Sequence, residues 1–333
     1  MGPRIRTTLV GSYPLPAWLA AMPGKGALRD ATAVVLKTQE NAGIDMVVDG
    51  ELYRFDINHP ETNGMIEYFV RPMSGVRNEI TREDKKKFSA GRGMKFRARP
   101  SAVVESKLTA GTLDLPEDCR RARELTASPY KFTLTGPHML SKTLLDNHYG
   151  SRQELCRALA VILAEQVRDI QADVIQIDEA NITGNPQEAE WAAECINTVL
   201  AEVQTIPAMH LCFGNYGGQT IQKGRWQKLI GFIEMLHCEH ILVETAHRPS
   251  GELKYLAEVA SDVRYGVGVI DIKSTVVETP EVIARRIEAA AKVLGPERIA
   301  YVNPDCGFWM LDRSIADRKI EALVAGRNLY EGR

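Results

Sequence analysis

The segment Ala208-Met209-His210-Leu211-Cys212-Phe213-Gly214-Asn215 joins a short apolar run to turn-forming residues. Residues 208–211 are predicted to form a β-strand, with His210 and Cys212 at its carboxyl end. A second polar strand end, Asn303-Pro304-Asp305-Cys306-Gly307, follows far downstream. One imidazole and two thiolates suit zinc, and ligands from separated loops favour a catalytic site over a structural one. Structural zinc sites usually use C-x2-C pairs, and this sequence contains none.

Similar short β-branched runs recur along the chain, separated by amphipathic helical patterns. Strands are predicted at 7–10, 45–48, 131–135, 173–177, 208–211, 240–243, 264–270 and 299–302. Helices are predicted at 30–43, 151–171, 186–203, 226–236, 250–260, 280–294 and 316–325. This alternation predicts an α/β protein, a (β/α)8 TIM barrel, as a single domain over residues 1–333. A doubly wound open sheet is the alternative, although no G-x-G-x-x-G motif follows the first strand.

The alternation fails between residues 52 and 130, which we interpret as an insertion or lid region after the second strand. A structureless loop of that length is uncommon, so we expect this region to contain its own hairpin or helix. Within it, the segment 71–99 is rich in Lys and Arg. Such a segment is usually a solvated face. The alternative is a lid, or a docking surface for an anionic substrate tail.

Composition and charge limit the classes of partner. A net charge of −2 disfavours nucleic acid and anionic membrane surfaces. No apolar run approaches the roughly 20 residues needed to cross a bilayer, and no signal-peptide core follows residues 1–4. With six cysteines and no such signal, we expect a protein of the reducing cytoplasm. The oligomeric state is left open, with a homo-oligomer among the alternatives.

Polar residues follow seven of the eight predicted strands. Barrel enzymes place catalytic residues at the carboxyl ends of their strands, so these residues should converge on one rim. Singly, each has a simpler interpretation: Ser12 as a turn residue, Glu179 as a helix cap, and Asp49 with its following glycine as a turn pair. Together they predict one active site, formed by Gly11-Ser12, Asp49-Gly50-Glu51, Asp178-Glu179, His210 with Cys212, Glu244-Thr245, Asp271-Ile272-Lys273 and Asp305-Cys306.

Five blocks in this series resemble the cobalamin-independent methionine synthase family, specifically its C-terminal catalytic zinc barrel as a stand-alone protein. The blocks are Val48-Asp49-Gly50-Glu51, Gln176-Ile177-Asp178-Glu179, residues 210–215, Val243-Glu244-Thr245 and residues 303–307. The resemblance runs from residues 7–14 to the helical pattern at 313–326, almost the whole chain. It implies that zinc is bound by His210, Cys212, Glu244 and Cys306. It also implies that Ser12, Glu51 and Asp178 hold an amino-acid thiol.

Other cysteines and histidines offer alternative metal ligands. His237, Cys238, His240 and His247 surround the Glu244 block. His237 and Cys238 precede the predicted strand, so they should point to the other end of the barrel. The remaining cysteines, at positions 119, 156 and 195, lie in predicted helices or turns, and we interpret them as ordinary residues.

The implied chemistry is transfer of a methyl or alkyl group to a small-molecule thiol. Zinc coordination removes the thiol proton and leaves a nucleophilic sulfur. Carboxylates at two strand ends, Glu51 and Asp178, suit the ammonium group of an amino acid. The family carries a histidine of a proton relay after the Asp-Ile of its seventh strand, where this chain has Lys273. We therefore assign catalytic roles to Asp178, Asp271 and Lys273, with Lys273 supplying a proton or anchoring an anionic substrate group.

A second departure from the family concerns the methyl donor. Folate-using relatives carry a tryptophan shortly after a Gly-Pro-Val block, and the corresponding residues 136–143 contain no Phe, Tyr or Trp. The missing ring removes a contact worth about 1–3 kcal/mol, by analogy with base stacking. The leading function is zinc-dependent methyl transfer to homocysteine, giving methionine, from an unidentified alkyl donor. The alternatives are a lyase resembling epoxyalkane–coenzyme M transferases, with Lys273 or the 71–99 segment holding an anionic thiol, and a non-catalytic zinc- or thiol-binding protein.

Overall fold

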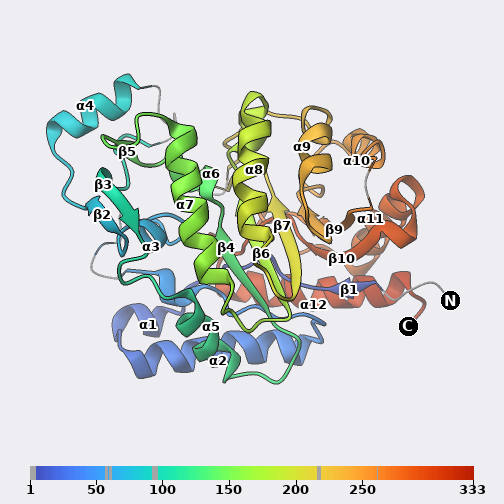
Figure 1. Cartoon of the computed structure of the whole chain (residues 1–333). Coiled ribbons are helices and arrows are strands. Elements are labelled where there is room, and N and C mark those ends of the chain that lie inside the picture. The colour runs from blue at the N-terminus through green and yellow to red at the C-terminus, as the bar shows by residue number, and fades with distance from the viewer. Residues whose placement is uncertain (1–4, 57–58, 60–61, 92–96, 216–218, 261) are drawn as a thin grey trace.

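Two β-sheets organise this computed structural model, which describes residues 5–56, 59, 62–91, 97–215, 219–260 and 262–333. The larger sheet has seven strands in the order β1-β10-β9-β8-β7-β6-β4, and all its neighbouring strands are parallel (Figure 1). Their bounds are Arg6–Thr7 (β1), Lys131–Thr135 (β4), Val174–Glu179 (β6), Ile206–Leu211 (β7), His240–Val243 (β8), Arg264–Ile270 (β9) and Ile299–Pro304 (β10). The sheet curls, with helices against it, which confirms the predicted α/β class.

Residues 46 and 47 connect the two edges of this sheet. Thr8 pairs with Met46, and Val47 pairs with Tyr130, in isolated parallel bridges. The N–H of Met46 donates to the Thr7 carbonyl oxygen at 3.1 Å, and the N–H of Lys131 donates to the Val47 carbonyl oxygen at 2.9 Å. The predicted strand 45–48 is thus reduced to these two bridges, which lie between β1 and β4.

Helices cover the outer face of the curled sheet (Figure 1). The α-helices outside the 52–130 region are Ala17–Ala21 (α1), Lys25–Ala42 (α2), Pro137–Ser141 (α6), Arg152–Val167 (α7), Ala189–Leu200 (α8), Ile230–Met235 (α9), Leu253–Ala257 (α10), Pro280–Leu294 (α11) and Arg313–Tyr330 (α12). Short 3-10 helices are Leu52–Arg54 (η1), Ile182–Gly184 (η2), Pro186–Glu188 (η3), Trp226–Leu229 (η4), Ser250–Glu252 (η5) and Pro296–Arg298 (η6). Helix α7 begins after Ser151, which caps it: the Ser151 hydroxyl accepts the Glu154 N–H at 3.2 Å.

The core lies on both faces of the larger sheet. Every residue of β4, β6, β8 and β10 is buried, as expected for parallel strands covered on one face by helices and packed together on the other. Most of these residues are apolar. Lys131, Gln176 and Asp178 are exceptions that place polar groups inside the curled sheet.

The 52–130 region contains secondary structure of its own. Its elements are Glu67–Val70 (α3), Ser74–Arg77 (β2), Arg82–Ala90 (α4), Val103–Thr109 (β3) and Leu115–Arg123 (α5). Strands β2 and β3 pair antiparallel, and β3 pairs parallel with Leu145–Asp146 (β5), which comes from outside this region. Helix α5 contacts α2 and α7, so it belongs to the helices around the larger sheet.

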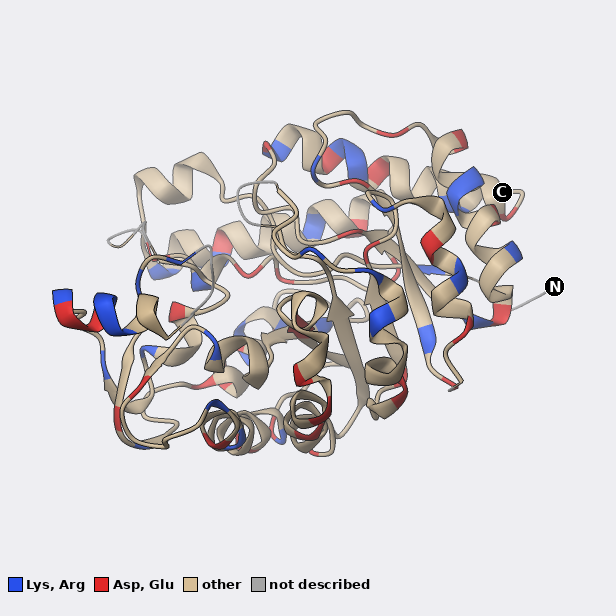
Figure 2. Cartoon of the chain, turned by 90° about the horizontal axis from the view of Figure 1, so that it is seen from above, with Lys and Arg blue, Asp and Glu red and all other residues tan. Residues whose placement is uncertain are grey.

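Basic and acidic residues are interspersed over the molecule, as the view from above shows (Figure 2). In the basic 71–99 segment, Arg77 NH1 lies 3.1 Å from Asp84 Oδ2, and Lys87 Nζ lies 3.1 Å from Glu83 Oε1. Residues 92–96 of that segment lie outside the described residues. Among the described helices, none combines the length and the apolar character needed to span a bilayer.

Candidate metal centre and substrate pocket

His210, Cys212 and Cys306 lie together at the carboxyl ends of β7 and β10. Their ligand atoms all fall within 4.8 Å of one another, and the two Sγ atoms are 3.8 Å apart. His210 Nδ1 lies 3.2 Å from the Leu242 carbonyl oxygen, so that nitrogen carries the proton and Nε2 carries the lone pair. Nε2 is buried with no hydrogen-bond partner among the described residues. A buried, unpartnered imidazole nitrogen beside two thiols fits a thiophilic metal ion.

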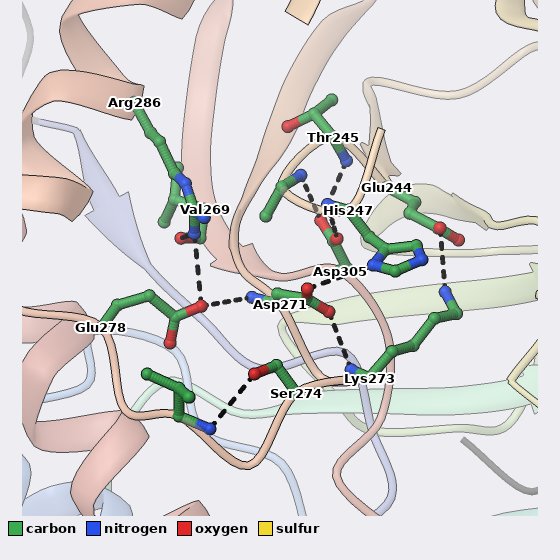
Figure 3. A network of polar contacts seen from close by, with 12 residues as sticks. Glu244, Thr245, His247, Val269, Asp271, Lys273, Ser274, Glu278, Arg286 and Asp305 are labelled. Carbon is green, nitrogen blue, oxygen red and sulfur yellow. Dashed lines mark hydrogen bonds and ion pairs between the residues drawn. The ribbon is translucent and has the colours of Figure 1, made fainter. Parts of the chain in front are cut away.

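Glu244 follows β8 and is fully buried beside this group. Its Oε1 accepts from Lys273 Nζ at 2.8 Å (Figure 3). Its Oε2 accepts the Phe213 N–H at 3.0 Å. Burial lowers the pKa of Lys273, but the charge and hydrogen bond of Glu244, together with the two cysteines, outweigh burial and raise the pKa above its usual value. Cys212 and Cys306 act in the same direction, so the Lys273 ammonium lies within electrostatic reach of both thiols. The described structure therefore pairs Glu244 with an internal cation.

The loop after Glu244 is held by Asp305. The carboxylate of Asp305 accepts the N–H groups of Thr245, Ala246 and His247 at 2.9, 2.8 and 2.7 Å (Figure 3). Burial and the charge of Glu244 together raise the pKa of Asp305 to about 7, although the three N–H groups lower it. Because Asp305 immediately precedes Cys306, these bonds fix the backbone carrying one proposed ligand against the backbone carrying another.

Asp271 forms the next layer of this network. Its Oδ1 accepts the backbone N–H of Lys273 at 2.8 Å, and its Oδ2 lies 3.1 Å from Nδ1 of His247 (Figure 3). The Asp271 N–H donates to Glu278 Oε1 at 2.8 Å. Asp271 thus holds the turn that directs Lys273 toward Glu244.

Glu51 is held in an unusual backbone conformation at the predicted rim. Its φ is 60°, in the left-handed region that non-glycine residues rarely occupy, and its N–H donates to Asp49 Oδ1 at 2.8 Å. A Cβ atom on Gly11 would lie 2.1 Å from Glu51 Oε1, so glycine at this position makes room for the carboxylate. Arg54 NH1 lies 3.3 Å from the same oxygen. This backbone places the buried Glu51 carboxylate inside the curled sheet.

Asp178 connects this carboxylate with the metal-ligand group. On the neighbouring strands β6 and β7, Asp178 pairs in register with His210. Burial raises the pKa of Asp178. Burial also raises the pKa of Glu51, and the charge of Asp178 raises it further although Arg54 opposes both effects. The two carboxylates are close enough to repel each other, so a ligand ammonium between them would be stabilised.

Ser12 completes the group of predicted residues on this rim. A Cβ atom on Gly307 would lie 2.0 Å from Ser12 Oγ, and the Phe308 N–H donates to the Ser12 carbonyl oxygen at 2.8 Å. The Asn215 side chain donates to the Gly307 carbonyl oxygen at 3.3 Å. The segments that follow β1, β7 and β10 are therefore in contact at Gly307 and Phe308, next to Cys306.

Comparison with known proteins identifies the family. Residues 5–326 match the family described as the catalytic domain of cobalamin-independent synthases. The chain belongs to this family. A methionine synthase from Thermococcus kodakarensis is 30% identical over 340 residues, which cover 97% of this chain and 93% of the relative.

Solved structures agree with this assignment to the methionine synthase family. The B12-independent methionine synthase from Shewanella sp. W3-18-1, solved in complex with selenomethionine, has a TM-score of 0.83 at 25% identity and covers 99% of this chain and 98% of that one. A putative vitamin-B12-independent methionine synthase from Listeria monocytogenes has a TM-score of 0.71 at 16% identity, with 98% coverage of both chains, and shows the fold alone. The family resemblance predicted from the five sequence blocks is confirmed.

In this family member, residues 136–143 form a largely buried segment in which two polar side chains pair with a residue outside the segment. Helix α6 buries His138, whose Nε2 lies 2.8 Å from Glu188 Oε2 and whose ring centroid lies 5.0 Å from that of Trp191. Lys142 Nζ donates to the same Glu188 oxygen at 2.7 Å. The side chains of this segment are thus engaged with neighbouring helices.

Two polar residues of the site escaped the sequence interpretation. Lys131 and Gln176 lie inside predicted strands, whereas the predicted site residues lie at or after strand ends. Both are buried, and Gln176 contacts Asp178 directly. A charged side chain in a strand that is otherwise uncharged was the signal that could have identified Lys131.

Proposed function

We propose that this protein transfers a methyl group to the thiol of homocysteine, giving methionine, with zinc held by His210, Cys212, Cys306 and Glu244. The observation that carries the proposal is the His210 ring, which has an unpartnered Nε2 and a ligand nitrogen within 4.8 Å of both thiols. Glu244 is the proposed fourth ligand because it contacts the backbone next to Cys212. Bound zinc would supply a deprotonated, nucleophilic substrate sulfur at neutral pH.

The amino-acid part of the substrate is held, in this proposal, by Glu51, Asp178 and Ser12. The two buried carboxylates receive the ammonium group, and the Ser12 hydroxyl donates to the substrate carboxylate. The register pairing of Asp178 with His210 puts the ammonium pocket next to the metal-ligand group, as a short amino-acid thiol requires. The Shewanella relative was solved with selenomethionine, the selenium analogue of the proposed product, which supports an amino-acid pocket in this fold.

The remaining catalytic assignments are Asp271 and Lys273. Asp271 orients the Lys273 backbone, and the Lys273 ammonium offsets the negative charge of Glu244 and the thiols. The lyase-like alternative would use Lys273 or the 71–99 segment to hold an anionic thiol. Because the Lys273 side chain is only 3% exposed and is paired with Glu244, transfer to homocysteine is favoured.

We also infer that the curled sheet closes into an eight-stranded barrel through residues 46 and 47. The bridges to Thr8 and Tyr130 support this closure. In this arrangement residues 1–333 form one domain, and the 52–130 region, apart from α5, is an insertion beside the barrel. Closure matters for function because it brings Glu51, which follows the second strand, to the same rim as the metal ligands.

The experiment that tests this function measures methionine formed from homocysteine by the zinc-loaded protein, using mass spectrometry and a panel of methyl donors. Glu51→Ala and Asp178→Ala should each raise the KM for homocysteine more than they weaken binding of 4-mercaptobutanoate, which lacks only the amine. If the unmodified protein binds both thiols equally well, the amino-acid pocket is wrong. The absence of methionine with every donor would contradict the proposed reaction.

A further inference from the structure

Lys131 is buried inside the curled sheet and has no role in the function proposed above. Its side chain begins at the first residue of β4 and is 1% exposed. Nζ donates to the Leu9 carbonyl oxygen at 2.6 Å and to Gln176 Oε1 at 2.6 Å. Burying an ammonium group is costly unless its partners compensate. The position of this cation therefore calls for an explanation.

Gln176 links Lys131 to the proposed substrate pocket. Its Nε2 donates to Asp178 Oδ1 at 2.7 Å and to the Val10 carbonyl oxygen at 2.9 Å. Gln176 and Asp178 are two residues apart on β6, so both point to the same face of the sheet. An ammonium group can only donate hydrogen bonds, so the Gln176 oxygen must face Lys131 and its NH2 group must face Asp178. Lys131 thus holds the oxygen of the Gln176 amide, while the Val10 carbonyl oxygen and Asp178 hold its NH2 group.

We propose that Lys131 and Gln176 are positioning residues that orient Asp178 to receive the ammonium group of the amino-acid thiol. The inference rests on the proposed function, in which Asp178 binds that group. Gln176 occupies Oδ1 of Asp178 and directs the carboxylate so that Oδ2 faces the ligand. Without the lysine, the amide oxygen would lose its donor and only the Val10 carbonyl oxygen and Asp178 would hold the amide, so it could move away from its position against Asp178.

The charges around the pocket support this role. Burial raises the pKa of both Asp178 and Glu51, and the positive charge of Lys131 opposes that effect at each carboxyl group. Burial lowers the pKa of Lys131, the same two carboxylates oppose that effect, and the resulting pKa is about 7. Arg54 is the other cation that lowers the pKa of both acids. Lys131 therefore helps to keep Asp178 in the ionised form that binds an ammonium group.

The test compares Lys131→Met and Gln176→Leu with the unmodified zinc-loaded protein. Calorimetry would give the Kd of homocysteine and of 4-mercaptobutanoate for each variant. Both variants should bind homocysteine about tenfold or more weakly, as expected when a hydrogen bond to a charged group is lost. Their affinity for the des-amino thiol should change less than about twofold. The double variant should lose little more than either single one, because both act through Asp178.

Lys142→Met is the matched control. Lys142 is another buried lysine, and it forms an ion pair with Glu188 away from Asp178. Lys142→Met should lower thermal stability without changing the ratio of the Kd values for homocysteine and 4-mercaptobutanoate. If Lys131→Met lost affinity for homocysteine and 4-mercaptobutanoate equally, as expected of the control, Lys131 would only stabilise the sheet. That result would overturn the proposal.

Failure of the proposed function would look different, because the unmodified protein would then show no preference for homocysteine. In that case, crystal structures of the unmodified protein and Lys131→Met would decide the positioning role. A turned Gln176 amide and a displaced Asp178 carboxylate would support it. An unchanged Asp178 side chain would overturn it.

Discussion

Replacing Lys273 with Met should destabilise the metal-free protein and tighten its binding of zinc. The Lys273–Glu244 ion pair is 2.8 Å long, with side chains 3% and 0% exposed, so the substitution leaves a buried carboxylate without its cation. Losing one partner of such a pair costs about 3–5 kcal/mol in the free energy of unfolding. If zinc becomes the partner of Glu244, much of that cost is recovered on metal binding. A recovery of about 3 kcal/mol corresponds to a roughly 100-fold lower Kd for zinc.

The assay combines urea unfolding, with and without zinc, and zinc competition against a chromophoric chelator. Lys142→Met serves as the control, because Lys142 lies 2.7 Å from Glu188 with side chains 9% and 16% exposed. This control should lose the same stability in both forms and leave the zinc Kd unchanged. The reasoning about Glu244 is refuted if Lys273→Met loses stability equally with and without zinc, or if it binds zinc more weakly.

Three further predictions concern the metal, the donor and acid stability. Cys306→Ser should abolish activity and most zinc binding, whereas Cys156→Ser, in α7, should do neither; full zinc content in the first variant would contradict the ligand assignment. Because residues 136–143 contain no Phe, Tyr or Trp, turnover with 5-methyltetrahydrofolate should be weak or absent; a methylfolate kcat/KM well above those of methylcobalamin and an S-methyl sulfonium donor would refute this. Burial raises the pKa of Glu188, but hydrogen bonds from a histidine and a lysine outweigh burial and lower it from 4.5 to about 2. The stabilisation that ionised Glu188 gives the folded protein is therefore present above pH 4.5 and lost as pH falls toward 2. Glu188→Gln should flatten the curve of unfolding free energy against pH in that range. An unchanged slope would show that the pairing contributes nothing.

Much of the larger sheet could be predicted from hydrophobic patterning. The predicted strands at 131–135, 240–243 and 264–270 have the same bounds as β4, β8 and β9, because parallel strands buried on both faces appear as short β-branched runs. The strand predicted at 45–48 contributes only two isolated bridges. Its pairing depends on how two edges of a curled sheet meet, which no local pattern records.

The candidate site, like the sheet, could be predicted only in part. Residue type and position at strand ends were sufficient to select His210, Cys212 and Cys306, which the structure brings together. The partner of a buried charge could not be predicted in this way. The contact of Lys273 with Glu244 joins the ends of two strands, and that of Lys131 with Gln176 depends on the register of β4 against β6.

The number of sulfur ligands on the metal tests the central claim most directly. X-ray absorption at the zinc edge of the zinc-loaded protein should show two sulfur atoms at about 2.3 Å, from Cys212 and Cys306. Addition of homocysteine should raise that number to three, because in the proposed function the substrate thiolate would bind the metal. A sulfur number that stays at two with saturating homocysteine, or a zinc ion without sulfur ligands, would contradict the proposed site.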